Sequence, residues 1–259
     1  MYKAKTLEDV LEGNKHKFNS DHRQVKKWIK SQNSEFRKSL IRSHGYNRVV
    51  SMFDFDQLSV LENFKHIDKL CVVSGSEDEL ETNFVSVNEV FATSLEGGYD
   101  LTEDWGQDDF KHKEILNSFD FVMCNQVLEH VPDPIRAFNN VVLMAKPGAY
   151  IWVSIPVINR IHDEPNFYSS GYHPRYLRFL SDNAKLDTIH IGAWRSLKYK
   201  LFAVSRNWPP YRKLKRGLRS NSDLIFPRGM FLDGTKLDYK HLVDTWGLFY
   251  KPKKQFLKS

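Results

Sequence analysis

Three histidines fall in loops where a reaction could use a base: His130, His162 and His173. An imidazole gains and loses a proton near neutral pH, so it suits removal of a proton from an acceptor group. His162 stands beside Asp163 and Glu164, whose charges would favour its protonated form. We predict His130 and His162 as catalytic residues. A purely structural role, as a hydrogen-bonding residue of the loop, is the alternative for each.

Aromatic residues follow these histidines closely in the chain. We predict that Tyr168, Tyr172, His173 and Arg175 bind the substrate. Aromatic rings in such a loop could form a wall over a sugar ring, although an aromatic-rich loop can also be simple packed cover.

Apolar runs alternate with helical patterns through the middle of the chain. The predicted strands cover residues 70–73, 84–87, 99–101, 119–124, 150–154, 188–191 and 243–250. A helix is predicted to begin at Asp133, as N-cap, and Pro134, at the first helical position. This alternation predicts an α/β fold with a doubly wound, mostly parallel sheet. In such sheets, ligands bind beyond the carboxyl ends of the strands.

Charge is distributed unevenly along the chain. Residues 1–49 carry 12 Lys and Arg against 5 Asp and Glu, residues 50–193 carry 10 against 23, and residues 194–259 carry 16 against 4. We predict a basic helical extension at residues 1–49, followed by one domain at 50–259 with a basic insertion at about 197–240. The basic ends suit an anionic surface or a phosphate-bearing partner, with solvated helix faces as the alternative.

Two motifs of the central region resemble a known family. Residues 119–122 and 127–134, followed by Lys146-Pro147-Gly148 and a strand, resemble the class I S-adenosylmethionine-dependent methyltransferases. The segment from Pro156 through residues 162–168 resembles a branch frequent in gene clusters for sugars and cell-surface polysaccharides. The resemblance covers about residues 68–193. It implies a Rossmann-like, seven-stranded sheet, S-adenosylmethionine as cofactor, and O-methylation of a sugar, glycan or other small molecule.

The resemblance also implies which residues hold the cofactor. These are the first loop, the end of the second strand for the ribose, an acidic loop for the adenine, and the loop after residues 119–124: Ser74, Gly75, Ser76, Asn88, Glu89, Asp100, Leu101, Asn125 and Gln126. The first loop departs from the family pattern. It has one glycine where an acid followed by three spaced glycines is usual.

Other functions remain open at this point. The reduced glycine loop would suit a non-catalytic binding module on the same fold, and the basic ends would suit an RNA methyltransferase, although nucleic acid is not the predicted partner. A nicotinamide oxidoreductase is disfavoured, because no Gly-x-Gly-x-x-Gly follows the first strand. We expect reduced core thiols at Cys71 and Cys124, no metal requirement, no transmembrane segment and a cytoplasmic location.

Overall fold

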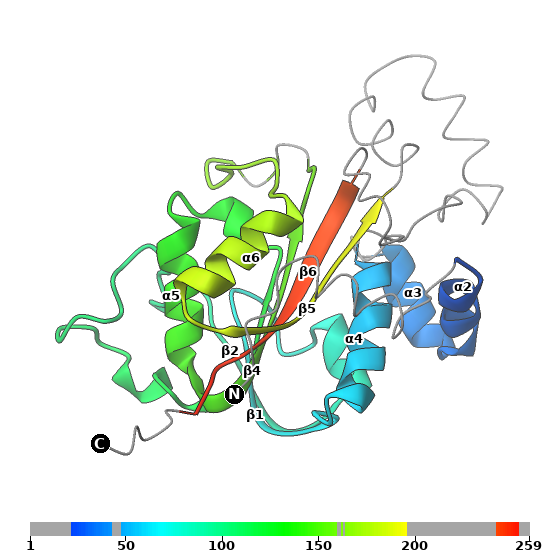
Figure 1. Ribbon diagram of the computed structural model, residues 1–259, viewed down its shortest axis with the longest axis horizontal. Helices are drawn as coiled ribbons and strands as arrows, with labels where there is room; N and C mark the ends of the chain where they lie inside the picture. The colour runs from blue at the N-terminus through cyan, green and yellow to red at the C-terminus, as the bar shows by residue number, and fades with distance from the viewer. Residues whose placement is uncertain (1–21, 43–47, 160–161, 163, 196–241, 254–259) are drawn as a thin grey trace, which may run out of the picture.

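The computed structural model describes residues 22–42, 48–159, 162, 164–195 and 242–253. This part of the chain forms one six-stranded sheet with helices on both faces (Figure 1). The helices are α2 (His22–Ser31), α3 (Ser34–Arg42), α4 (Val49–Leu61), α5 (Pro134–Met144) and α6 (Pro174–Asn183), with the short 3₁₀ helices η2 (Leu80–Phe84), η3 (Lys113–Ile115) and η4 (Leu128–His130). The strands are β1 (His66–Val72), β2 (Ser86–Ala92), β3 (Phe119–Asn125), β4 (Ala145–Pro156), β5 (Asp187–Arg195) and β6 (Leu242–Tyr250).

The strand order is β2-β1-β3-β4-β6-β5. Strands β1 to β4 pair in parallel, and β6 runs antiparallel to both β4 and β5. The chain leaves β1 for β2 on one side and returns to β3 on the other, so the strand order reverses between β1 and β3. The predicted doubly wound, mostly parallel sheet is confirmed, and the carboxyl ends of β1 and β3 form the edge where such folds bind ligands.

The described sheet has six strands, not the predicted seven, because residues 99–101 lie outside any strand. Asp100 Oδ1 accepts hydrogen bonds from the backbone N–H and the hydroxyl of Thr102, both at 2.8 Å. The indole of Trp105 donates to the Asp100 carbonyl. Local bonds of this kind compete with a strand ladder, which explains why the expected third strand does not form.

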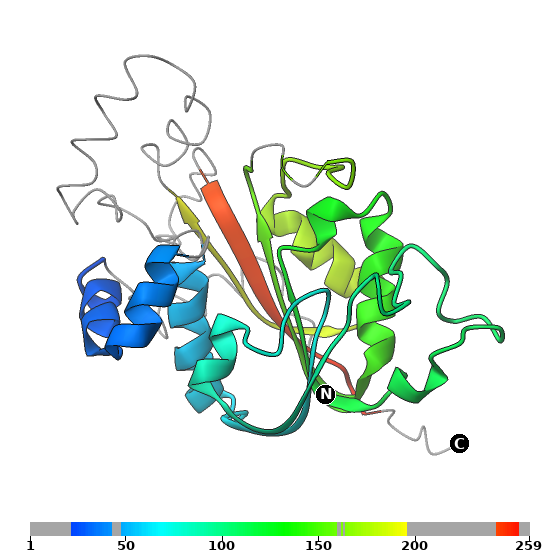
Figure 2. The ribbon, with the colours of Figure 1, turned by 180° about the vertical axis from the view of Figure 1, so that it is seen from behind.

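Each face of the sheet has its own core, since successive side chains of a strand point to opposite faces. Phe121 of β3 packs on the side of α4, and its neighbour Val122 packs on the side of α5 and α6. Helices α2 and α3 lie beside α4, as the view from behind shows (Figure 2). The sheet is thus covered on both faces and leaves its strand ends for the site.

The described part of the predicted basic extension packs on α4. Trp28 donates from Nε1 to Asp56 Oδ2 at 2.7 Å, and its ring contacts Phe53 and Phe84. Residues 22–42 therefore share a core with the sheet. The division into an extension and a domain stays a prediction, and the insertion at 197–240 lies outside the described residues.

Two local predictions are confirmed, the start of α5 and the two buried free cysteines. Helix α5 starts at Pro134, and Asp133 Oδ1 accepts a hydrogen bond from the Arg136 backbone N–H at 3.0 Å. Cys71 and Cys124 are buried free thiols, and burial raises the pKa of Cys71 to about 12. In the part of the chain that the structure describes, no helix is long and apolar enough to span a membrane.

Candidate active site

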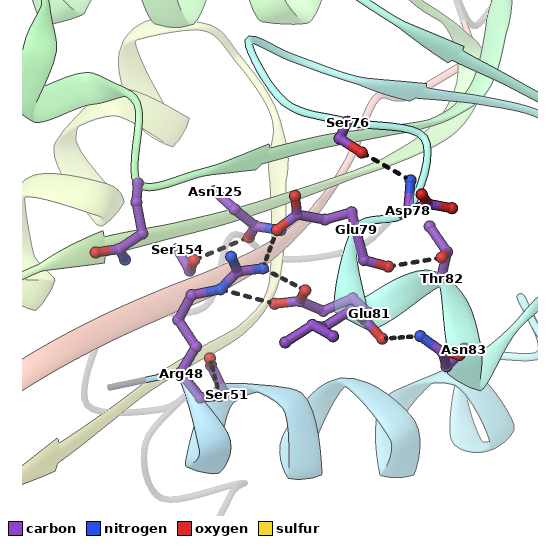
Figure 3. A network of polar contacts seen from close by, with 12 residues as sticks. Arg48, Ser51, Ser76, Asp78, Glu79, Glu81, Thr82, Asn83, Asn125 and Ser154 are labelled. Atoms are coloured by element: carbon purple, nitrogen blue, oxygen red, sulfur yellow. Dashed lines mark hydrogen bonds and ion pairs between the residues drawn. The ribbon is translucent and has the colours of Figure 1, made fainter. Parts of the chain in front are cut away.

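Polar side chains from β3, β4 and the segment after β1 form one network at the carboxyl edge of the sheet (Figure 3). Ser154 Oγ donates to Asn125 Oδ1 at 2.8 Å, and Asn125 Nδ2 lies 3.4 Å from Glu79 Oε1. Glu79 in turn contacts the guanidinium of Arg48. The network therefore joins three strand ends at the reversal point, and it contains Asn125, one of the predicted cofactor residues.

Arg48 lies at the N-cap of α4 and extends to this network. Its Nε donates to Glu81 Oε1 at 3.2 Å, and its Nη2 contacts the carboxylates of both Glu79 and Glu81. Glu81 is fully buried. Burial lowers the pKa of Arg48, but the two carboxylates outweigh it and raise the pKa, so the guanidinium stays charged. Sequence reasoning missed these three residues. The only signal was a charged residue directly before an apolar helix.

Two further carboxylates of this edge are buried without full hydrogen bonding. Glu129 of η4 is 0% exposed, and in the described part of the chain neither of its carboxylate oxygens has a hydrogen-bond partner. Asp244 of β6 is 1% exposed; its Oδ1 accepts from Gln126 Nε2 at 3.2 Å, and its Oδ2 has no partner among the same residues. Burial raises the pKa of Glu129 to about 7 and the pKa of Asp244 well above its ordinary value, against the opposing charge of Arg48. Sequence reasoning missed both residues as well.

The structure brings the two predicted bases together. The rings of His130 and His162 are 4.8 Å apart between centroids and lie edge to face, and Phe167 contacts both. His130 Nδ1 lies 2.8 Å from the carbonyl oxygen of Asn166. A carbonyl oxygen can only accept a hydrogen bond, so Nδ1 carries the proton. In a neutral His130, Nε2 is then unprotonated and its lone pair can accept a proton. Asp163, expected to act on His162, lies outside the described residues.

The predicted substrate-binding residues lie between the end of β4 and the first turn of α6. The ring of Tyr172 stacks on Tyr176 with centroids 4.7 Å apart, and its hydroxyl is 3.4 Å from the Leu128 carbonyl. Tyr168 is 55% exposed. His173 caps α6, because its Nδ1 accepts from the Arg175 backbone N–H at 3.2 Å. A substrate contact by these residues stays a prediction, and His173 has a structural role in any case.

The first loop lies where it was expected, at the carboxyl end of β1. Ser74 has a positive φ of 49°, and its N–H donates to Thr93 Oγ1 at 3.0 Å. A Cβ at Gly75 would lie 2.6 Å from Val72 Cγ1, so a larger residue would force the loop away from the strand. Ser76 Oγ accepts from the Asp78 N–H. Ser74, Gly75 and Ser76 therefore form a tight, exposed turn at the ligand edge.

The predicted position of Asn88 and Glu89 was wrong. The second strand runs from Ser86 to Ala92, so both residues lie inside β2 and not at its carboxyl end. Glu89 Oε2 instead pairs with Lys69 Nζ at 2.9 Å, and Asn88 donates to Asp68. The residue that follows β2 is Thr93, which is buried and already bonded to Ser74. The reason for assigning Asn88 and Glu89 to a ribose is thus removed.

The predicted adenine loop is folded on itself. The Asp100 carboxylate is bonded to Thr102, and Leu101 is buried with its carbonyl accepting from Asn140 Nδ2 at 3.0 Å. Gln126, the last of the predicted cofactor residues, has a positive φ of 55° and reaches Asp244. Of the nine predicted cofactor residues, the first loop and the pair Asn125 and Gln126 lie at the carboxyl edge.

A family model for a methyltransferase domain matches residues 35–181, which is more than half of the 259 residues. The chain belongs to this methyltransferase-domain family. The matched part contains Arg48, the first loop and the pair His130 and His162. No curated protein matches the chain.

Solved methyltransferases are similar to this methyltransferase domain in fold. A proposed sarcosine dimethylglycine methyltransferase from Galdieria sulphuraria aligns with a TM-score of 0.44 and 14% identity over 78% of this chain and 85% of that chain. The N-methyltransferase NodS from Bradyrhizobium japonicum gives 0.43 and 11% over 94% and 98%. Phosphoethanolamine N-methyltransferase 2 from Haemonchus contortus gives 0.40 and 14% over 86% and 61%. Likeness at this level carries no conclusion about reaction or substrate.

Proposed function

We propose that this protein transfers a methyl group from S-adenosylmethionine to a small acceptor molecule. The observation that carries the proposal is the position of the family match. Residues 35–181 include the charged network around Arg48, the first loop, and the histidine pair. A charged strand edge and a pair of bases in one matched region are the parts that methyl transfer to a protic acceptor needs.

The residues at the edge fit the amino-acid half of this cofactor. S-adenosylmethionine carries an ammonium, a carboxylate and a sulfonium, so it needs both anionic and cationic partners. The unpaired carboxylate oxygens of Glu129 and Asp244 suit a cation, and Arg48 is the nearby cation. Because Gly75 has no Cβ, the turn at the end of β1 can pack closely against Val72. The nucleoside half has less support, since Thr93 follows β2 where an acid is usual in the family.

When bound, the cofactor supplies a methyl group activated on a positively charged sulfur. The chain's own contribution is to orient the acceptor and to take its proton. His130 is oriented for this role by its Nδ1 bond to the Asn166 carbonyl, which leaves Nε2 to accept a proton. His162 and Phe167 hold the ring from the side. Tyr168 and Tyr172 are the proposed aromatic contacts of the acceptor.

The acceptor that we propose is a hydroxyl of a sugar, a glycan or another small molecule, on the strength of the resemblance in residues 156–168. Among the solved structures named above are N-methyltransferases, so an amine is the other acceptor to test. We also propose a cytoplasmic protein, since both cysteines are free and buried. A phosphate-bearing or anionic partner would meet the basic ends.

The decisive experiment is a calorimetric titration of the full chain with S-adenosylmethionine and S-adenosylhomocysteine, followed by transfer of a labelled methyl group to panels of alcohols and amines. We expect micromolar binding, and turnover that is lost in His130→Ala while binding of S-adenosylhomocysteine remains. Turnover with amines alone would mean that the acceptor group is an amine and not a hydroxyl. Turnover with neither panel would count against a small acceptor.

A second candidate is a non-catalytic binding module on the same fold. Two observations favour it: the single glycine of the first loop, and Thr93 at the position after β2. This candidate predicts no binding of either cofactor form to the folded protein. An RNA methyltransferase is the third candidate and rests on the basic ends, which lie largely outside the described residues. It predicts RNA binding that weakens steeply with salt.

A further inference from the structure

Three carboxylate oxygens at the ligand edge are buried and have no hydrogen-bond partner among the described residues. They are both oxygens of Glu129 and Oδ2 of Asp244. Both side chains are almost completely excluded from solvent, at 0% and 1% exposure. Buried polar groups in native proteins nearly always have a partner, and an ionised carboxylate without one is especially costly. These oxygens therefore require a proton or a cationic ligand.

The neighbouring groups of the protein do not meet this need. The guanidinium of Arg48 is already bonded to Glu79 and Glu81. His130 Nε2 lies 3.8 Å from Glu129 Oε1, which is beyond hydrogen-bonding distance. Gln126 satisfies one oxygen of Asp244 and leaves the other. Among the described residues, this edge thus holds more carboxyl groups than the guanidinium of Arg48 pairs with.

An organic cation matches these oxygens better than a metal ion does. Among the described residues, no three His, Cys, Asp or Glu side chains are arranged to hold a metal. An ammonium group has up to three N–H donors and needs only a few acceptors in hydrogen-bonding range. We propose that Glu129 and Asp244 form a subsite for an organic cation, an ammonium or a sulfonium group of a bound ligand.

The subsite deepens the proposed function and rests on it in taking this edge as the ligand site. The same chemistry has two sources: the methyl donor, which carries a sulfonium and an ammonium, and an acceptor that carries an amino group. Binding of the cation would release protons from the carboxylates. Among the described residues, the titratable groups that face Glu129 or Asp244 are Arg48 at the N-cap of α4, Cys124 of β3, His130 of η4 and Tyr172 after β4. Burial raises the pKa values of the Glu129 and Asp244 carboxyl groups, so these are the groups that we expect to release protons when the cation binds.

The test is a titration of the full chain with matched probes that differ in charge. S-adenosylmethionine and S-adenosylhomocysteine form one pair, and glucosamine and glucose form the other. The variants are Glu129→Gln and Asp244→Asn, with Glu89→Gln as the control carboxylate in the middle of β2. We expect each variant, but not the control, to weaken binding of a cationic probe about tenfold or more. In the first pair the loss is larger for S-adenosylmethionine, which has one more positive charge.

Each outcome decides between the sources or against the subsite. A loss confined to the first pair assigns the subsite to the methyl donor, and a loss confined to glucosamine assigns it to an amino-bearing acceptor. Unchanged affinity of both variants for every cationic probe overturns the subsite while leaving the proposed function intact. If the wild type binds only glucosamine and this binding depends on Glu129, the result supports the subsite but overturns the proposed methyl transfer. A wild type that binds no cationic probe overturns both.

A second measurement needs no variant. In the wild type, binding of S-adenosylmethionine should release protons, seen as a binding enthalpy that changes with the ionisation enthalpy of the buffer. The affinity ratio of S-adenosylmethionine to S-adenosylhomocysteine should rise between about pH 6 and pH 8, as Glu129 ionises. A ratio that is flat with pH, together with a buffer-independent enthalpy, would exclude the methyl donor as the source of the cation. A buffer-independent enthalpy of glucosamine binding as well would overturn the subsite, even where a variant fails to fold.

Discussion

Glu129 Oε1 lies 3.8 Å from His130 Nε2, so a buried carboxylate faces the nitrogen that we propose as the proton acceptor. The distance is too long for a hydrogen bond but short for a charge interaction in a buried environment. A ligand group that binds the Glu129 carboxylate therefore also lies close to Nε2 of His130.

This relationship predicts a specific loss of turnover on removal of the imidazole. We expect His130→Ala to lower kcat by about 10²–10⁴-fold, which is the usual contribution of a general base. Affinity for S-adenosylhomocysteine should stay within a few-fold, because the change removes no charge from the cofactor's expected contacts. Steady-state kinetics and calorimetry together measure both. The control is His66→Ala, at the amino end of β1, far from the carboxyl edge. Equal activity of both variants would remove His130 as the base.

Stability should fall with rising pH through the titration of Glu129. Its pKa in the folded protein is about 7, above the ordinary value near 4.5, because burial disfavours the charged form. Between these two values the folded protein holds a proton that the unfolded chain has lost. The stabilisation that results is complete below about pH 4.5 and is lost as the pH rises to about 7. The loss corresponds to about 3 kcal/mol of unfolding free energy.

We expect Glu129→Gln to remove that part of the pH dependence. Between about pH 5 and pH 8, the unfolding free energy measured with urea should fall by about 2.5 kcal/mol less in the variant than in the wild type. Asp244, whose pKa is also raised by burial, keeps its own contribution in both proteins. Glu35→Gln on α3 is the control, since that carboxylate is exposed. If the unfolding free energy of the variant changes with pH as much as that of the wild type, Glu129 does not have a raised pKa.

Glu89 should have no part in cofactor binding. It lies inside β2 and pairs with Lys69 on the surface, where the two side chains are 57% and 43% exposed. Exposed pairs contribute about 0–1 kcal/mol, so we expect Glu89→Gln to change the unfolding free energy by less than about 1 kcal/mol. Its affinity for S-adenosylhomocysteine should equal that of the wild type. A tenfold loss of affinity, measured by calorimetry, would return Glu89 to the site.

Elements with strong local signals could be predicted from the sequence. Strand β3 is an apolar run interrupted by Asp120, and α5 starts with the capping residue Asp133 followed by Pro134, so both were placed correctly. The second strand was placed too early in the sequence. When the predicted end of a strand is wrong by a few residues, a residue assigned to that end lies inside the strand instead. Glu89 was assigned to a cofactor site for this reason, although it lies in the middle of β2.

The charged network could not be predicted in the same way. Arg48 and Glu81 are 33 residues apart in sequence, and only the packing of α4 against η2 brings them together. Asp244 and Gln126 are separated by 118 residues and meet because β6 inserts antiparallel between β4 and β5. Contacts of this kind depend on strand order, which local patterns do not encode. The histidine pair was predicted as two separate candidates for a related reason.

The network around Arg48 should be essential for stability. We expect Arg48→Met to lower the unfolding free energy by about 3–5 kcal/mol, because it leaves the buried carboxylate of Glu81 without its partner. The double variant Arg48→Met with Glu81→Gln should recover part of this loss, since a neutral amide costs less to bury unpaired than an ionised carboxylate does. The control is Lys69→Met, which breaks a solvent-exposed pair.

Urea unfolding at about pH 7 of the wild type, Arg48→Met, Glu81→Gln and the double variant forms a double-mutant cycle for Arg48 and Glu81. A coupling energy of about 2 kcal/mol or more is expected, against less than about 1 kcal/mol for an exposed pair. If Arg48→Met costs no more than Lys69→Met, the guanidinium is not needed to balance the buried carboxylates. The fold would then tolerate a neutral edge, and Arg48 would be free to serve a ligand alone.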